Sequence, residues 1–151
     1  RRRLFIFFLM FSTRLADWST DEQYLCQIRY EVFVSEQGVP PELEVDGEDE
    51  TAIHAAAFID HAQVVGTSRM LTCGKIGRMA VLRAYRQKGI GRALLDELVQ
   101  EGRKHNMARV YLGAQLPAIP FYERAGFSVY GDVFLDAGID HQMMELFLAH
   151  D

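Results

Sequence analysis

The stretch RMAVLRAYRQKGIGRALLDEL (Arg78–Leu98) decides how this chain folds, because an apolar strand passes through a glycine-containing turn directly into a helix. Gly89 and Gly91 let the backbone turn tightly and approach a ligand closely. The first turn of a helix leaves its N–H groups without partners inside the helix, and these groups favour an anion. The stretch therefore predicts a phosphate site that is held mainly by backbone amides.

Three cationic side chains accompany this turn. Arg86, Lys88 and Arg92 add positive charge, although a partly exposed ion pair contributes only about 0 to 1 kcal/mol. The spacing matches neither the dinucleotide pattern G-x-G-x-x-G nor the Walker A pattern, so nucleotide hydrolysis has no support. Because turns with glycines before a helix are common, an ordinary strand-to-helix connection stays an alternative.

The remaining pattern outward from this stretch predicts a mixed α/β fold. Ser19 and Thr20 precede Glu22 and Gln23 with the offset of a capping box, and apolar residues then recur at helical spacing. We expect helices over Asp21–Ser35 and Arg92–His105 and a short one between Pro117 and Gly126. We expect strands over Phe11–Asp17, His54–Asp60, Val64–Leu71, Ile76–Leu82, Ala108–Gln115, Phe127–Leu135 and Gln142–Leu148.

Length and composition indicate one domain. The chain has 151 residues, of which 49% are hydrophobic, which is enough for one well-filled core. We assign that domain to residues 11–151 and interpret residues 1–10 as an upstream extension or a disordered N-terminus. The apolar run Leu4–Phe11 has eight residues, against roughly 18 to 20 in a membrane helix, and no cleavage site of the A-x-A kind follows it. We therefore expect neither export nor a membrane partner.

The charge and the cysteines narrow the class of protein further. A formal net charge of −5 argues against a nucleic-acid partner, whose electrostatic footprint would be basic. Cys26 and Cys73 fit neither a metal-binding spacing nor a disulfide framework. A reducing cytoplasm is the simplest location, and we expect no metal.

Two motifs together resemble those of the GNAT acetyltransferases. Arg86 to Gly91 matches the family signature Q/R-x-x-G-x-G/A, and IPFYERAGF (Ile119–Phe127) is similar to the family's second motif. The resemblance covers nearly the whole chain from Phe11 onward. The segments VFVSEQGVP and EVDGEDE, together with His54, further resemble the ElaA-type branch of the family.

The resemblance implies a fold in which two neighbouring parallel strands splay apart and acetyl-CoA lies between them. Those strands would be Ile76–Leu82 and Ala108–Gln115. The backbone of Met79, Ala80 and Val81 would pair with the pantetheine arm as an added strand does. The pyrophosphate would meet the phosphate turn, which consists of Arg86, Gln87, Lys88, Gly89, Ile90, Gly91 and Arg92. Gln115 stands close to where many relatives have an asparagine, so the contact of that asparagine is in question.

The implied reaction is direct attack of an amine on the thioester, which needs no covalent nucleophile. Tyr122 is the candidate general acid, since a phenol with a pKa near 10 can protonate a departing thiolate; simple packing beside Phe121 is the alternative. A lysine-like amine is almost fully protonated near pH 7, so a general base is expected. The candidates stand next to the ends of predicted elements: Glu36, Asp46, His54 and His141.

The acidic run Glu42–Glu50 has two interpretations. It either attracts a cationic amine to the entrance of the site or forms a solvated loop. We expect an N-acetyltransferase acting on a small-molecule or peptide amine, and a catalytically silent module that binds CoA or an acyl-CoA is the alternative. The oligomeric state stays open, with a homodimer as one option.

Overall fold

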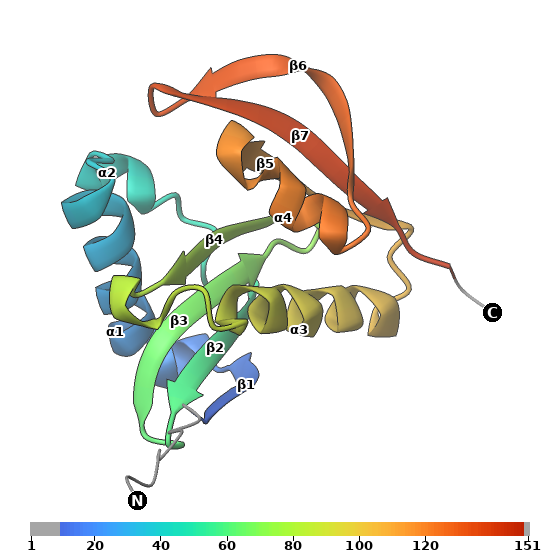
Figure 1. Ribbon diagram of the computed structural model, residues 1–151. Coiled ribbons are helices and arrows are strands. Elements are labelled where there is room, and N and C mark those ends of the chain that lie inside the picture. Colours follow the sequence, from blue (N-terminus) through green and yellow to red (C-terminus); the bar gives the residue numbers. More distant parts are fainter. Residues whose placement is uncertain (1–9, 150–151) are drawn as a thin grey trace, which may run out of the picture.

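The computed structural model describes residues 10–149 as two antiparallel sheets with helices between and beside them (Figure 1). The strands are β1 (Phe11–Ala16), β2 (Ile53–Ile59), β3 (Gln63–Met70), β4 (Ile76–Val81), β5 (Arg109–Gln115), β6 (Ser128–Asp136) and β7 (Ile139–Phe147). The α-helices are α1 (Trp18–Arg29), α2 (Pro41–Glu44), α3 (Ile90–Lys104) and α4 (Ile119–Arg124). A π-helical segment, Tyr30–Glu36, extends α1, and 3₁₀ turns span Arg83–Tyr85 and Leu116–Ala118.

The sheets meet at one point. The first sheet has the strand order β1-β2-β3-β4 and the second has the order β5-β7-β6. Between β4 and β5, the strands that face each other, the described residues form a single parallel bridge, which joins Lys75 to Tyr111. The mixed α/β fold expected from the sequence is confirmed, and the bounds of its strands agree with the expected ones within a few residues.

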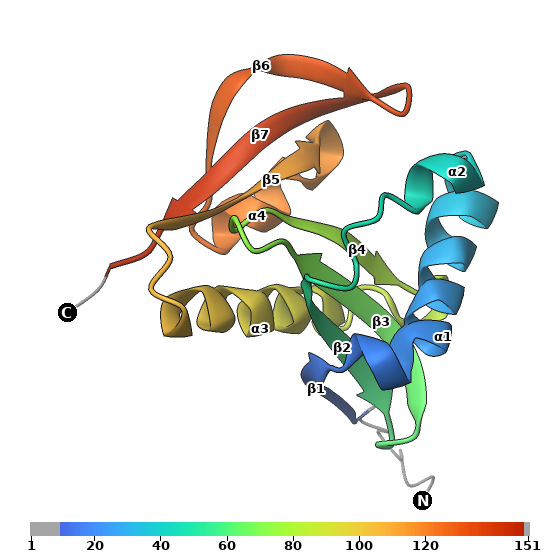
Figure 2. The same cartoon turned by 180° about the vertical axis from the view of Figure 1, so that it is seen from behind.

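Helix α3 packs its apolar face into the hydrophobic core. Its apolar stripe, Leu94, Leu95 and Leu98, is fully buried, as expected for an amphipathic helix that covers one face of a sheet. Figures 1 and 2 show α3 and α1 on opposite faces of the first sheet. Because α3 packs on one face of the sheet that contains β4, the start of α3 is held in a fixed position relative to the end of β4. None of the helices described between residues 10 and 149 is long and apolar enough to cross a bilayer.

Helix α1 begins earlier than the sequence indicated. The N-cap is Asp17, whose Oδ1 accepts hydrogen bonds from the Ser19 N–H at 3.0 Å and the Ser19 hydroxyl at 2.7 Å. The prediction of a start at Asp21 after a Ser19–Thr20 cap was wrong, because an aspartate at the end of β1 already supplies the acceptor that a helix start needs.

The acidic segment 42–50 turns three of its carboxylates inward. Arg29, which is 1% exposed, donates to the carboxylates of Glu44 and Asp49. Arg69, 5% exposed, donates to Asp49 at 3.1 Å and to Asp46 at 2.7 Å. The interpretation as a solvated loop therefore fits the exposed Glu42, Glu48 and Glu50, whereas the other three carboxylates neutralise buried arginines; the attraction of an amine stays a prediction. We call Arg29, Glu44, Asp46, Asp49 and Arg69 the ionic cluster.

The ionic cluster shifts the titration of its members. The hydrogen bonds from Arg69 hold the pKa of Asp46 far below its ordinary value. Burial alone would raise the pKa of Asp49, but the hydrogen bonds and charge of Arg29 outweigh it and leave that pKa lowered. The cluster thus keeps Asp49 ionised in the interior, where an unpaired charge would be costly.

Substituting methionine for Arg29 removes the cation shared by Glu44 and Asp49. We expect it to lower the free energy of unfolding by about 3 to 5 kcal/mol at pH 7, because it strands buried carboxylates. Urea denaturation measures this loss. The matched control is Arg14→Met: Arg14 pairs with Asp21 at 3.4 Å with 53% of its side chain exposed, so its loss should cost less than about 1 kcal/mol.

The pH dependence of the free energy of unfolding is a second test of the Arg29→Met variant, and its outcome can contradict the account. Because the folded state lowers the pKa values of Asp46 and Asp49, their contribution to stability is complete above about pH 4 and is lost as the pH falls further. The wild type should therefore lose more stability than Arg29→Met between pH 6 and pH 3. Equal losses would show that the cluster does not stabilise the fold electrostatically.

Candidate active site

The turn before α3 presents a row of backbone amides. Gly89 is the N-cap of α3 with φ at 87°, and no side chain caps the helix. Gln87 also has a positive φ, 61°. The first hydrogen bond back to the cap runs from the Ala93 N–H to the Gly89 carbonyl at 3.1 Å. For residues 10–149, no hydrogen bond is recorded from the backbone N–H groups of residues 87–92, so they remain available to an anion.

Two of the cationic side chains predicted around this turn already pair with a carboxylate. Arg86 donates to both carboxylate oxygens of Glu36, at 2.6 and 2.8 Å, and its Nε donates to the Val81 carbonyl at 2.8 Å. Arg92 pairs with Asp96 at 3.1 Å. Arg86 therefore braces the turn against β4 and the end of the π-helical segment, and its charge is already compensated by Glu36.

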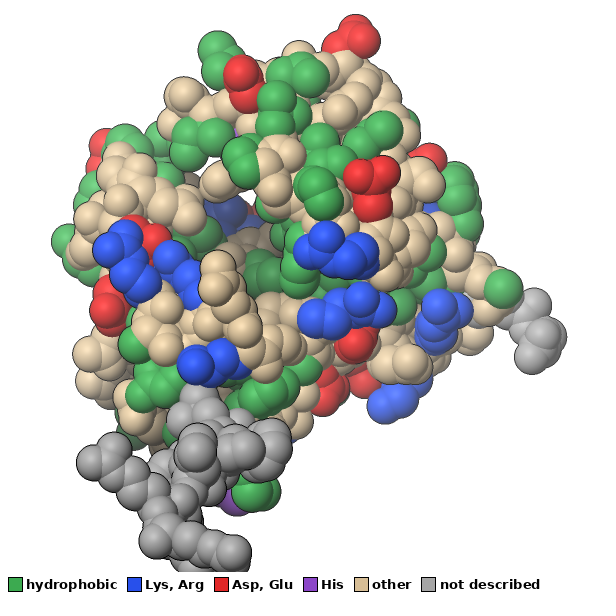
Figure 3. All heavy atoms as spheres, in the orientation of Figure 1, with side chains coloured by type: hydrophobic (Ala, Val, Ile, Leu, Met, Phe, Trp, Pro, Cys, Tyr) green, Lys and Arg blue, Asp and Glu red, His purple; other side chains and the backbone are tan. Residues whose placement is uncertain are grey.

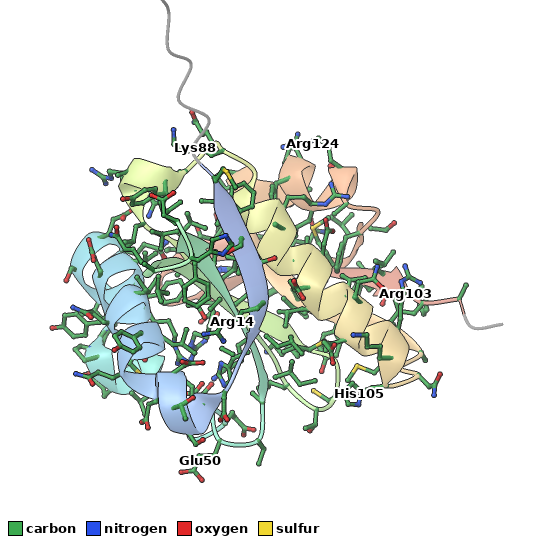
Figure 4. The ribbon with its side chains drawn as sticks, turned by 90° about the horizontal axis from the view of Figure 1, so that it is seen from below. Arg14, Glu50, Lys88, Arg103, His105 and Arg124 are labelled. Atoms are coloured by element: carbon green, nitrogen blue, oxygen red, sulfur yellow. The ribbon has the colours of Figure 1, made fainter. Side chains whose placement is uncertain are left out.

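Arg124 is a residue that the sequence analysis missed. Figure 4 shows Lys88 and Arg124 at the end of α3 where the helix begins, while Arg103 and His105 lie at its far end. The Arg124 carbonyl accepts a hydrogen bond from Arg92 at 3.4 Å, which ties α4 to α3. In the sequence Arg124 is only the arginine in the last turn of the IPFYER helix. Its separation from the phosphate turn along the chain gives no sign that the two lie close together.

The register of β4 determines which of its backbone groups face away from β3. Thr67 is opposite Ala80, and the Leu82 N–H donates to the Val65 carbonyl at 2.9 Å. Since hydrogen-bonding directions alternate along an antiparallel strand, Ala80 pairs toward β3 while Val81 points its groups toward β5. The register shifts at Arg78 and Met79, so the regular alternation stops before Met79. Of the backbone groups expected to hold pantetheine, those of Val81 lie on this open edge, where Arg86 already occupies the Val81 carbonyl, and the contact of Met79 stays a prediction.

A cleft of about 530 Å³ lies between the strands. Figure 3 shows this face hollowed at its centre, with Lys and Arg side chains on both sides of the hollow. The residues that line the cleft come from both sheets and from the segment after α1: Phe33, Gln37, Val39, Leu43, Glu44, Lys75, Ile76, Gly77, Arg78, Met79, Leu112, Gly113, Gln115, Ala118, Tyr122, Phe134, Asp136, Ala137, Ile139, His141 and Met143.

The cleft contains Tyr122. Its ring packs edge-on against Phe121 and Phe127, with centroids 5.0 and 6.0 Å away. Burial raises the pKa of Tyr122 from 10.0 to about 12. The hydroxyl therefore keeps its proton at every physiological pH, as a proton donor must. The ring packs as the alternative has it, and the residue also lines the cleft; the role of general acid stays a prediction.

The cleft also contains His141, which is 9% exposed. Its Nδ1 lies 2.7 Å from the Ile139 carbonyl. A carbonyl only accepts, so this contact assigns the proton of the neutral ring to Nδ1 and leaves a lone pair on Nε2. No partner for Nε2 is recorded within the described part of the chain, and a neutral imidazole with a free lone pair can take a proton.

The other candidate bases lie elsewhere. Glu36 is held by Arg86, whose hydrogen bonds lower its pKa, so it is a weak base outside the cleft lining. His54 is 2% exposed and stacks on Trp18, and its Nε2 contacts the Asp49 carbonyl at 2.8 Å. Burial lowers the pKa of His54, and its position beside the ionic cluster separates it from the cleft. Asp46 belongs to that cluster.

Three further observations concern Gln115, metal binding and a second cavity. Gln115, which stands close to where many relatives have an asparagine, lines the cleft and donates to Gln37 at 3.5 Å. Among the described residues, no group of three or more His, Cys, Asp or Glu side chains is arranged to hold a metal ion. A second cavity, of about 520 Å³, lies between α1 and the first sheet, and none of the candidate acids or bases lines it.

Comparison with known proteins identifies the family. A family model described as an acetyltransferase (GNAT) domain matches residues 16–148. The chain is 37% identical over 123 residues to YjcF of Bacillus subtilis, named as an N-acetyltransferase, and the match spans 78% of this chain and 87% of YjcF. It is 30% identical over 125 residues to ElaA of Escherichia coli, a match that spans 78% of this chain and 81% of ElaA.

Solved structures agree with these sequence relatives. The crystal structure of Escherichia coli ElaA superposes with a TM-score of 0.80 at 28% identity, over 90% of this chain and 99% of ElaA. An acyl-CoA N-acyltransferase from Pseudomonas aeruginosa superposes with a TM-score of 0.79 at 30% identity, with the same coverage of 90% and 99%. The expected resemblance to the ElaA-type branch is thus confirmed. The chain belongs to the GNAT family of acetyltransferases and is an acyltransferase of coenzyme A thioesters.

Proposed function

We propose that this enzyme transfers the acetyl group of acetyl-CoA to a primary amine by direct attack, with both substrates bound at once. The observation that carries the proposal is the continuity of the site: the amide turn before α3, the open edge of β4 and the cleft with Tyr122 and His141 follow one another along one path. A ligand with a diphosphate at one end and a thioester at the other fits that order of groups.

The coenzyme is held by this chain's backbone. The amides of residues 87–92 meet the pyrophosphate, with Lys88 and Arg124 as nearby cations. The backbone groups of Met79 and the Val81 N–H pair with the pantetheine arm as an added strand. Arg86 acts as a positioning residue, because its bonds to Glu36 and Val81 fix the turn relative to β4.

The residues in the cleft divide the proton transfers. A protonated amine has no lone pair, so His141 Nε2 first takes the ammonium proton; the neutral nitrogen then attacks the thioester carbon, the new C–N bond forms, and the second nitrogen proton leaves to solvent. The C–S bond breaks, and the Tyr122 hydroxyl gives its proton to the departing sulfur. Burial disfavours charge on the departing sulfur as it does on the phenol. The proton affinity of the sulfur therefore rises toward the raised proton affinity of Tyr122. Exchange with water then restores both side chains.

Removing the hydroxyl tests the acid. Tyr122→Phe keeps the packing against Phe121 and Phe127, so we expect the dissociation constant for acetyl-CoA to stay within about two-fold while kcat falls by about 10² to 10⁴. Calorimetry and thiol release measure the two quantities. Tyr30→Phe, at a position 54% exposed, should leave both unchanged. Unchanged kcat in Tyr122→Phe would remove Tyr122 from the mechanism.

The base is tested through pH. For an acceptor with a pKa of about 10.4, the neutral fraction rises about ten-fold per pH unit below that value. His141→Gln should therefore cost about 10² in kcat/KM at pH 7 and much less at pH 9, because the neutral fraction of the amine is about a hundred-fold larger at pH 9. His105→Gln, on the exposed far end of α3 (Figure 4), is the control. A loss that is equal at both pH values would contradict the role of base.

The amide turn is tested at its cap. Gly89→Ala places a side chain where φ is 87°, so the turn must shift and its amides lose their alignment. We expect about a ten-fold weaker affinity for CoA by calorimetry. Gly131→Ala imposes a similar positive φ of 70° in β6, outside the cleft, and should leave CoA affinity unchanged. Equal affinities in both variants would argue against phosphate binding at this turn.

A further inference from the structure

The parallel bridge fixes a register between β4 and β5. Lys75 is opposite Tyr111, so two residues further along each strand Gly77 comes into line with Gly113. Both glycines line the cleft, at the point where the strands begin to separate. On the β4 side this part of the cleft is therefore bounded by bare main chain, at Gly77.

Gly77 is not required by its backbone. Its φ lies outside the left-handed range, and a Cβ built on it would meet no atom within 4 Å. A glycine inside a strand weakens that strand and commonly marks close approach of a ligand or another backbone. At Gly77 the space that a side chain would take is open to the cleft.

The opposite wall is closed by an aromatic ring. A Cβ on Gly113 would lie 3.4 Å from Phe134 Cζ and 3.7 Å from Met143 Sδ, so the ring of Phe134 covers this glycine. The same ring stacks on His141, with centroids 5.8 Å apart and planes at 26°. His141 is 9% exposed, and its Nε2 has no hydrogen-bond partner among the described residues. A ring nitrogen with no hydrogen bond inside the described part of the chain thus adjoins the wall that faces the open space.

We propose that Gly77 and Gly113 form an acceptor slot, which admits a primary amine on an unbranched carbon and excludes one on a branched carbon. This proposal rests on the proposed function. The carbon chain of the acceptor lies over Gly77, with Phe134 opposite, and its nitrogen reaches toward His141 Nε2. Lysine side chains and alkylamines belong to the admitted class, and the α-amines of amino acids and peptides other than those of glycine belong to the excluded class.

The width of the slot is the physical reason. Paired strands lie about 4.8 Å apart, and the slot lies only two residues beyond a paired position. A methylene chain packs at about 3.5 to 4.0 Å from the carbon atoms of each wall, so it needs a gap of roughly 7 to 8 Å, which these strands reach only by separating beyond the paired distance; a branch beside nitrogen needs still more room. An alkylamine with a pKa near 10.4 also needs a base, which His141 supplies.

Isomeric amines test the slot in the wild-type enzyme. n-Butylamine and sec-butylamine have the same atoms and differ in the branch beside nitrogen, so we expect kcat/KM by thiol release to be at least about ten-fold higher for n-butylamine. A blocked peptide with one lysine should likewise exceed a lysine-free peptide with a free N-terminal alanine. Equal rates, or faster reaction of the branched amines, would overturn the slot while leaving acetyl transfer intact. Failure of every amine with acetyl-CoA bound would overturn the proposed function, and the slot with it.

Filling the slot is the second test. Gly77→Val should lower kcat/KM for n-butylamine at least about ten-fold, with Gly77→Ala intermediate, while the dissociation constant of acetyl-CoA stays within about two-fold. Ser128→Val adds similar volume to β6 outside the cleft lining and should change neither quantity. Unchanged turnover in Gly77→Val, or a loss matched by weaker acetyl-CoA binding, would show that Gly77 does not shape an acceptor site. Thermal unfolding of each variant verifies that it is folded.

Discussion

After the single bridge between Lys75 and Tyr111, strands β4 and β5 do not continue to pair within the described chain. Buried backbone groups must find hydrogen-bond partners, so a strand edge left open inside a fold needs either water or a ligand. The opening leaves the outward edge of β4 at Val81 free of a strand partner, shortly before the amide turn that precedes α3. The cleft, the proposed coenzyme path and the acceptor slot all depend on this separation of two strands.

The ionic cluster supports the open side of the cleft. It joins the segment after α2 to α1 and β3 through Arg29 and Arg69, and Arg78 extends the connection to β4 by donating to the Glu44 carbonyl at 3.0 Å. Arg78 adopts a positive φ of 49°, a costly conformation for a residue with a side chain. The cluster thus helps to hold one wall of the cleft beside the apolar contacts of Ile28, Val32 and Ala80. It also explains why Glu44 and Asp49 are buried.

Local patterns were sufficient to predict the elements and the amide turn. Gly89 ends a strand-to-turn segment and starts a helix, and those preferences act over a few residues. Contacts between distant segments were not predictable in the same way. Glu36 and Arg86 lie 50 positions apart, and nothing in either local sequence indicates that they pair. His54 and His141 both stand near strand ends, so only the tertiary structure separates a histidine beside an ionic cluster from one in the cleft.

Amide hydrogen exchange, followed residue by residue by NMR with and without acetyl-CoA, tests the central claim most directly. If the coenzyme completes the open edge of β4, the Met79 and Val81 amides and those of residues 87–92 become protected together, while the Ala80 amide, which already faces β3, changes little. Protection confined to residues 87–92, with no change at Met79 and Val81, would contradict the claim that the separated strand grips the coenzyme.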